Sequence, residues 1–98
     1  MIELLKSATF DRWLVALKDR LAKARIEARI RRMSLGNPGD VRPVGEGISE
    51  MRIDHGAGYR VYFMRRGPLL IILLCGGDKS TQDQDIVQAK MLARQWRD

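Results

Sequence analysis

The segment Ile48–Lys79, which reads ISEMRIDHGAGYRVYFMRRGPLLIILLCGGDK, determines how this chain folds. Apolar and polar residues alternate over 50–53 and 60–63, and a period of two is typical of half-buried β-strands. Residues 69–75 are apolar without a break, which indicates a central strand covered on both sides. Glycine-marked turns separate the strands, so we predict a meander with one apolar side and one side of arginine and tyrosine.

Two helices are predicted before the meander. Thr9 is the expected N-cap of the first, whose apolar stripe includes Trp13 as a core residue. The second helix runs from about 18 to 35, and a kink near Lys18–Asp19 separates it from the first. Gly36 ends the second helix, because a left-handed residue is needed there.

The remaining segments complete an α+β fold. Residues 2–5 are a weak candidate for a first strand, and 41–44 form an edge strand because Pro43 cannot donate a ladder hydrogen bond. A last helix begins after a cap at Ser80 or Thr81 and packs on the sheet through its apolar face. We therefore predict a small antiparallel sheet with two N-terminal helices and one C-terminal helix, in the order β-α-α-β-β-β-β-α.

The chain is strongly basic, which bears on the kind of partner it could bind. Its 98 residues, a single domain spanning 1–98, carry a net charge of +6 and have a pI near 10.1. Arginine outnumbers lysine, and arginine suits bidentate contact with phosphate and stacking on bases. A nucleic acid, an acidic protein and a solvated basic surface without a target all fit this composition.

Several other classes of chemistry lack the residues they need. His55 is the single histidine and Cys75 the single cysteine, so we expect no metal centre, no cofactor and no internal disulfide. Cys75 lies within the apolar run and is interpreted as a core thiol in a reducing, cytoplasmic setting. No apolar run approaches the ~20 residues of a membrane helix, and we expect no membrane association.

The candidate site is Arg52, Arg60, Tyr62 and Lys79, with Glu50 beside them. In a meander the first three project to one side, and Lys79 enters from the end of the central strand. Cations there stabilise the charge that develops when the 2′-hydroxyl of RNA attacks its own phosphate, and a tyrosine can stack on a base. Two alternatives remain: ordinary cross-strand pairs of Glu50 with an arginine, and a surface for a carboxylate-rich protein.

Three blocks of the sequence are distinctive in combination: GNPGDVRPVGEGISEMRI at 36–53, GYRVYF at 58–63 and GGDKSTQ at 76–82. They resemble the addiction-module killer proteins of the phage Gp49-like/HigB group, within the RelE/ParE toxin superfamily. The resemblance covers nearly the whole chain, from the helix that begins near Phe10 to the last helix.

This resemblance implies a RelE-like fold and the toxin of a type II toxin–antitoxin module. The implied partner is a cognate antitoxin of the DNA-binding helix-turn-helix type. Many members of the superfamily are metal-independent endoribonucleases, or mRNA interferases, which cut mRNA on the ribosome and block translation. ParE-like members inhibit DNA gyrase without catalysis, and this is the alternative function.

The resemblance also assigns roles by position. Arg60 matches a transition-state arginine of the RelE-like nucleases, and Lys79 falls where those nucleases hold a basic residue after the last strand. These two are the implied catalytic residues. Arg52 matches a strand position that contacts phosphate.

The chain departs from the family pattern near its last helix. RelE-like nucleases have a stacking tyrosine there and HigB-like proteins a histidine, whereas this segment has Gln82, Asp83 and Asp85. Tyr62 or Tyr59 would then supply the stacking surface for RNA. The general base of the reaction is not identified by the sequence.

Overall fold

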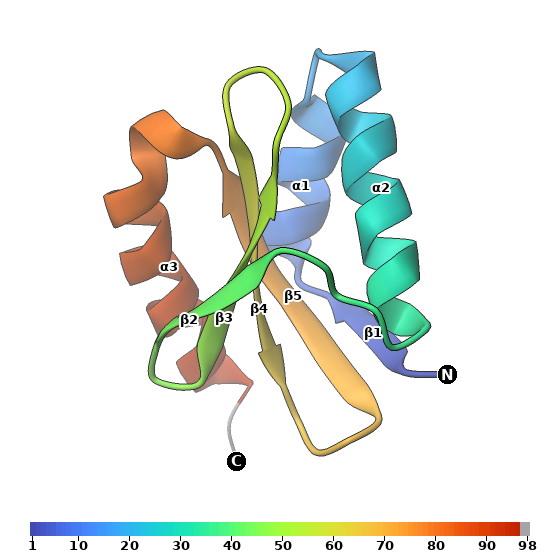
Figure 1. The fold of residues 1–98 in the computed structure, drawn as a ribbon. Coiled ribbons are helices and arrows are strands. Elements are labelled where there is room, and N and C mark those ends of the chain that lie inside the picture. Colours follow the sequence, from blue (N-terminus) through green and yellow to red (C-terminus); the bar gives the residue numbers. More distant parts are fainter. Residues whose placement is uncertain (97–98) are drawn as a thin grey trace.

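The computed structural model describes residues 1–96, and Figure 1 shows their arrangement. These residues form five strands, three α-helices and one short 3₁₀ turn. In order they are β1 (Glu3–Lys6), α1 (Ala8–Ala16), α2 (Arg20–Ser34), β2 (Val41–Gly45), β3 (Ile48–Ile53), β4 (Tyr59–Arg65), β5 (Leu70–Gly77), η1 (Lys79–Thr81) and α3 (Gln82–Gln95). The predicted α+β class and the predicted order of elements are confirmed.

The strands form one sheet in the order β1-β5-β4-β3-β2. The meander from β2 to β5 is antiparallel, as predicted. The expectation of a wholly antiparallel sheet is wrong, because β1 pairs with β5 in parallel. Parallel strands need a long connection. Here the connection from β1 to β5 contains both N-terminal helices and most of the meander.

The sheet is the middle of three layers, with α1 and α2 on one face and α3 on the other (Figure 1). Each face has its own cluster of buried side chains. Those under α1 and α2 are Phe10, Leu14, Ile26, Ile30, Met33, Met51, Ile53, Val61, Phe63, Ile71 and Leu73. Those under α3 are Ile48, Tyr62, Met64, Ile72, Leu74, Cys75, Ala89 and Ala93.

Helix α1 is capped by Ser7 instead of Thr9, so that prediction is wrong. The Ser7 hydroxyl accepts a hydrogen bond from the amide of Phe10 and donates one to the carbonyl of Leu74. A buried serine at this position therefore satisfies the helix and joins it to β5. Asp19 caps α2 by accepting from the amide of Ala22 at 3.0 Å, which confirms the break between the two helices.

Other local predictions are confirmed. Gly36 follows α2 with a φ of 94°, and Pro43 lies on β2 at an edge of the sheet. Trp13 is partly buried against the core under α1 and α2. Cys75 is buried, and burial raises the pKa of its thiol to about 12.

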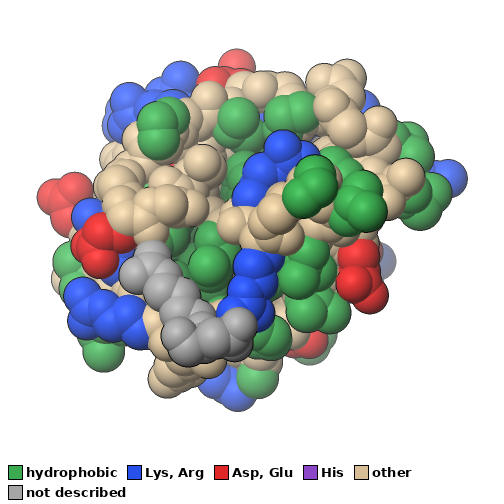
Figure 2. Space-filling model, turned by 90° about the horizontal axis from the view of Figure 1, so that it is seen from below, with side chains coloured by type: hydrophobic (Ala, Val, Ile, Leu, Met, Phe, Trp, Pro, Cys, Tyr) green, Lys and Arg blue, Asp and Glu red, His purple; other side chains and the backbone are tan. Residues whose placement is uncertain are grey.

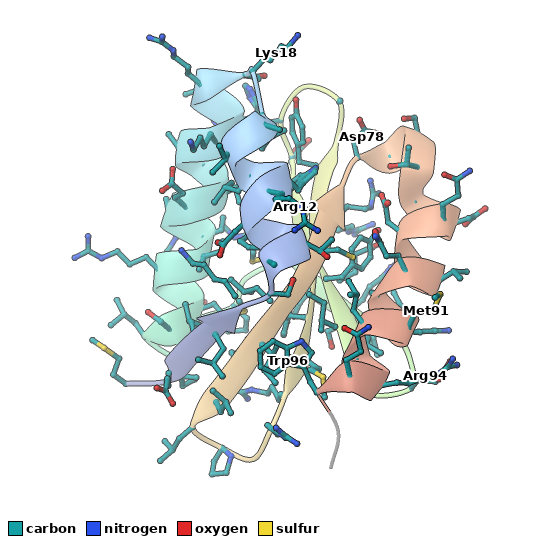
Figure 3. The ribbon with its side chains drawn as sticks, turned by 180° about the vertical axis from the view of Figure 1, so that it is seen from behind. Arg12, Lys18, Asp78, Met91, Arg94 and Trp96 are labelled. Carbon is teal, nitrogen blue, oxygen red and sulfur yellow. The ribbon has the colours of Figure 1, made fainter. Side chains whose placement is uncertain are left out.

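Helix α3 lies along the sheet with Asp78 just before its head and Trp96 at its far end (Figure 3). The Trp96 side chain packs against the core under α3. Met91 and Arg94 point away from the sheet in the same view, and 59% of Met91 is exposed. Within residues 1–96, no helix has both the length and the apolar character needed to cross a membrane.

Candidate functional site

One side of the sheet carries Glu50 and Arg52 of β3 together with Arg60 and Tyr62 of β4. Arg52 faces Arg60 across the ladder, and Glu50 faces Tyr62. Because residues that face each other across an antiparallel ladder share a side, the sequence correctly grouped Arg52, Arg60 and Tyr62. This is the side that α3 covers.

The expectation that this whole side is an open cationic and aromatic surface is wrong. Tyr62 and Glu50 are each 0% exposed, and Arg60 is 9% exposed. The ring of Tyr62 belongs to the core under α3, so it is not available to stack on a base. The alternating pattern identified the side of each residue, and the packing of α3 then decided which of them reach solvent.

The part that remains open is a pocket of about 460 Å³ at one end of the sheet. The β3–β4 loop and the start of η1 and α3 meet at this end (Figure 1). Its lining includes Arg52, Arg60, Lys79, Tyr59, Asp40 and Asp54. Three cations and one tyrosine predicted from the sequence are thus brought together, whereas Tyr62 is not among them.

Arg60 is the most tightly held cation of the pocket. Its Nη1 donates a hydrogen bond to the carbonyl of Gly58 at 2.9 Å, and its Nε lies 3.4 Å from Oε2 of Glu50. Gly58 has a φ of 76°, and a Cβ there would lie 3.5 Å from Nη1 of Arg60 and 3.4 Å from Cβ of Lys79. Contacts of this length are ordinary, so the positive φ is what favours glycine at this position.

Arg52 is more exposed and has an acidic neighbour. Its Nε lies 3.3 Å from Oδ2 of Asp40, which also lines the pocket. The backbone carbonyl of Arg52 accepts a hydrogen bond from Nη1 of Arg29 at 2.8 Å. Arg29 belongs to α2, and burial lowers its pKa.

Lys79 is exposed at the start of η1, and no ion pair to its ammonium group occurs within residues 1–96. Its backbone amide donates to the carbonyl of Ala57 at 3.3 Å, which fixes the head of α3 against the β3–β4 loop. Asp78 caps η1, because its carboxylate accepts a hydrogen bond from the amide of Ser80 at 2.8 Å. Hydrogen bonds from Ser80 lower the pKa of Asp78.

Glu50 is the centre of a buried polar cluster behind the pocket. Its Oε2 accepts from the hydroxyl of Tyr62 at 3.0 Å and from Nε2 of Gln82 at 2.8 Å, while its Oε1 lies 3.4 Å from Nε of Arg42. Burial, followed by the Glu50 carboxylate, raises the pKa of Tyr62. The sequence placed Glu50 beside the candidate site or in a cross-strand pair with an arginine, and it missed the central position of this residue. The available signal was a glutamate at an inward position of a predicted strand.

The pair Gly76–Gly77 at the end of β5 allows a close approach on both faces of the sheet. A Cβ on Gly76 would lie 2.4 Å from ring atoms of Trp13, and a Cβ on Gly77 would lie 1.8 Å from Oδ2 of Asp85. A Cβ at 76 would meet the rigid ring of Trp13, whereas a Cβ at 77 would force the Asp85 carboxylate to move. Asp85 also accepts from the hydroxyl of Thr81 at 2.6 Å, and burial raises its pKa.

His55 has a structural contact in the β3–β4 loop. Its Nε2 lies 3.3 Å from Oδ2 of Asp19, at the start of α2. The hydrogen bond from the amide of Ala22 lowers the pKa of Asp19, and His55 adds to this shift. In the part of the chain that the structure describes, no group of three or more His, Cys, Asp and Glu residues could hold a metal ion.

At the opposite end of the molecule, as far as residues 1–96 describe it, some cations lie beside an acid. Figure 2 views that end and shows lysine and arginine side chains in separate groups among hydrophobic and acidic ones. There Glu46 lies 3.7 Å from Nζ of Lys90 and 3.8 Å from Nη2 of Arg94. Acidic and basic groups therefore lie side by side at the far end of α3.

Fold and pocket define a small RelE-like α+β protein with cations gathered at one end of its sheet. Residues 12–95 match the family described as "phage derived protein Gp49-like (DUF891)". The chain belongs to this Gp49-like family, a RelE-like group associated with toxin–antitoxin modules. It is also 56% identical, over 94 residues, to an uncharacterized protein of Haemophilus influenzae, across 96% of this chain and 95% of that protein.

Proposed function

We propose that this protein is the toxin of a type II toxin–antitoxin module and that it cleaves mRNA on the ribosome. The observation that carries the proposal is the pocket in which Arg52, Arg60, Lys79 and Tyr59 meet. Membership of a family associated with toxin–antitoxin modules supports the same conclusion.

The proposed reaction uses the RNA itself as the nucleophile. The 2′-hydroxyl attacks the adjacent phosphorus and loses its proton to water in the open pocket. Arg60 and Arg52 bind the phosphate oxygens, where negative charge increases in the transition state. Lys79 donates a proton to the departing 5′-oxygen, and Tyr59 offers its ring to a base. The products are a 2′,3′-cyclic phosphate and a 5′-hydroxyl end.

A short pulse of expression without antitoxin tests this proposal. We expect growth arrest, cuts within translated reading frames, and 5′-hydroxyl ends at those cuts. The double variant Arg60→Ala, Lys79→Ala should lose the cuts while keeping its circular dichroism spectrum. The matched control is Lys90→Ala, Arg94→Ala, which removes two cations from the far end of α3 and should still cut. Cuts that persist in the pocket variant would contradict the residue assignment.

Inhibition of DNA gyrase is a second candidate, favoured by one observation. Gln82 lies near the pocket, in the segment where nucleases of the superfamily are expected to have a tyrosine or histidine. Its Nε2 donates a hydrogen bond to Oε2 of Glu50 at 2.8 Å. Gln82 therefore supplies neither a stacking ring nor an acid–base group. A supercoiling assay separates the candidates: blocked supercoiling with intact mRNA would establish the gyrase function.

An antitoxin with an acidic segment is the partner that the charge distribution favours. Helix α2 contains six cations and one acid, a net charge of +5, whereas the whole chain carries +6. An acidic segment across α2 and the pocket would neutralise both surfaces. Removing that segment from the antitoxin should weaken binding and reduce its dependence on salt. Unchanged affinity after this truncation would argue for a different mode of neutralisation.

A further inference from the structure

Glu50 is fully buried although it is an acidic residue. Burying an ion is costly unless other groups compensate for the lost water. Contacts from β2, β4 and α3 supply this compensation, through Arg42, Arg60, Tyr62 and Gln82. The opposite face of the sheet is filled by apolar side chains at the corresponding depth, so a packed core does not by itself require a charge here.

The contacts of Glu50 are unevenly shared between its two oxygens. Both neutral donors, Tyr62 and Gln82, bind Oε2, which is also the oxygen 3.4 Å from Nε of Arg60. The other oxygen, Oε1, makes no hydrogen bond and faces Arg42, whose side chain is 56% exposed. The oxygen that faces Arg60 is therefore the one held rigidly in place.

Arg60 is restrained at two of its three guanidinium nitrogens. Nη1 donates to Gly58, and Nε lies beside Glu50. Because the guanidinium group is planar and rigid, two restrained nitrogens also fix the direction of the third. The Nε of Arg60 makes no hydrogen bond, so the attraction of Glu50 for Arg60 rests on charge.

We infer that Glu50 is a positioning residue for Arg60: its buried negative charge holds the guanidinium in the orientation that the pocket needs. This inference rests on the proposed nuclease function. Glu50 does not line the pocket and acts on the RNA only through Arg60. Tyr62 and Gln82 belong to the same device, because they fix the oxygen that faces Arg60.

The variant Glu50→Gln tests the inference. A glutamine oxygen in the place of Oε2 still accepts from Tyr62 and Gln82, and its amide nitrogen takes the place of Oε1, which has no hydrogen bond to lose. The shape and the neutral hydrogen bonds remain, and the charge is removed. We expect kcat for mRNA cleavage on programmed ribosomes to fall on the order of 100-fold. We expect KM to stay unchanged or to fall, since Arg60 loses a competing anion.

The matched control is Arg42→Gln, which removes the other ion pair of the same carboxylate at an exposed edge strand. Its kcat should stay within about twofold of the parent value, because Oε2 keeps its contacts with Arg60, Tyr62 and Gln82. An equal kcat for Glu50→Gln and the parent, per folded molecule, would overturn the inference. If Glu50→Gln does not fold, the partly exposed Gln82→Leu decides: a fall in kcat at constant KM supports the inference, and an unchanged kcat overturns it.

A second measurement does not depend on activity. The side-chain Nε–H of Arg60, observed by ¹H–¹⁵N NMR, should give a signal with restricted rotation in the parent and an averaged one in Glu50→Gln. An identical signal in both proteins would overturn the inference. If the parent leaves mRNA uncut, the nuclease proposal fails, and this signal still decides whether Glu50 orients Arg60.

Discussion

The two faces of the sheet are buried in different ways. Toward α1 and α2, the core consists of apolar side chains from helices and strands. Toward α3, the helix contributes the small residues Ala89 and Ala93 to the core, and a polar cluster around Glu50 lies between the strands and the head of the helix. The first face is therefore stabilised by apolar burial, whereas the second combines apolar burial with a buried polar cluster.

This difference explains why the pocket lies where it does. Helix α3 covers Tyr62 and Glu50 completely, but it begins at Gln82 and does not extend over Arg52 and Lys79. The same helix contacts Glu50 through Gln82, and Glu50 lies beside Arg60 of the pocket. Changes on the first face away from Ile53 and Tyr59, which also line the pocket, should affect stability alone, whereas changes on the second should also affect the pocket.

The largest expected effect is on the apolar face. Phe10 is 0% exposed under α1, and Phe10→Ala should lower the free energy of unfolding by about 3–5 kcal/mol in urea denaturation. Val15→Ala on the same helix is the control, since Val15 is 76% exposed and should cost less than about 0.5 kcal/mol. A change in mRNA cleavage per folded molecule of Phe10→Ala would contradict the view that this face affects stability alone.

The adjacent glycines of β5 allow the same change on each face. Gly76→Ala drives a methyl group into Trp13, and Gly77→Ala drives one into Asp85, so each should lose about 1–3 kcal/mol of stability by overpacking. The second change that relieves them should differ: Asp85→Ala should restore more stability to Gly77→Ala than to Gly76→Ala, because only the methyl group at 77 meets Asp85. Thermal unfolding of the four proteins measures this. Equal repair of both would show that the two faces are not independent.

Tyr62→Phe sharpens the view of the polar face. It removes one of the two neutral donors to Glu50, so the free energy of unfolding should fall by about 1–2 kcal/mol. Tyr59→Phe is the control, because within residues 1–96 the Tyr59 hydroxyl makes no hydrogen bond to protein. Equal losses for the two variants in urea denaturation would mean that the cluster around Glu50 contributes nothing specific.

The smallest expected effect concerns Asp85 and pH. Burial raises its pKa above the ordinary 3.8, so the folded state holds this proton more tightly than the unfolded chain. Ionisation of Asp85 therefore lowers stability as pH rises through 3.8 to the folded pKa. Asp85→Asn lacks this loss, so its melting temperature should exceed that of the parent at neutral pH and match it below about pH 3. A constant difference at every pH would exclude this origin.

Much of the architecture was predictable from local sequence. The alternation in β3 and β4, the apolar run of β5 and the glycine at 36 each gave a correct element or boundary. The grouping of Arg52 with Arg60 followed from strand pairing. The cap of α1 was misplaced at Thr9, because the contact of Ser7 with Leu74 is tertiary.

The sequence by itself determined which residues share a side of the sheet, because side chains alternate strictly along a strand. Only the tertiary structure decided which of them are covered. The packing of α3 buried Tyr62 and made Glu50 a buried partner of Arg60, and it left Arg52 and Lys79 open to solvent. The physical reason is that burial depends on how far a neighbouring element extends over a face, and that distance is absent from the periodicity of the strands.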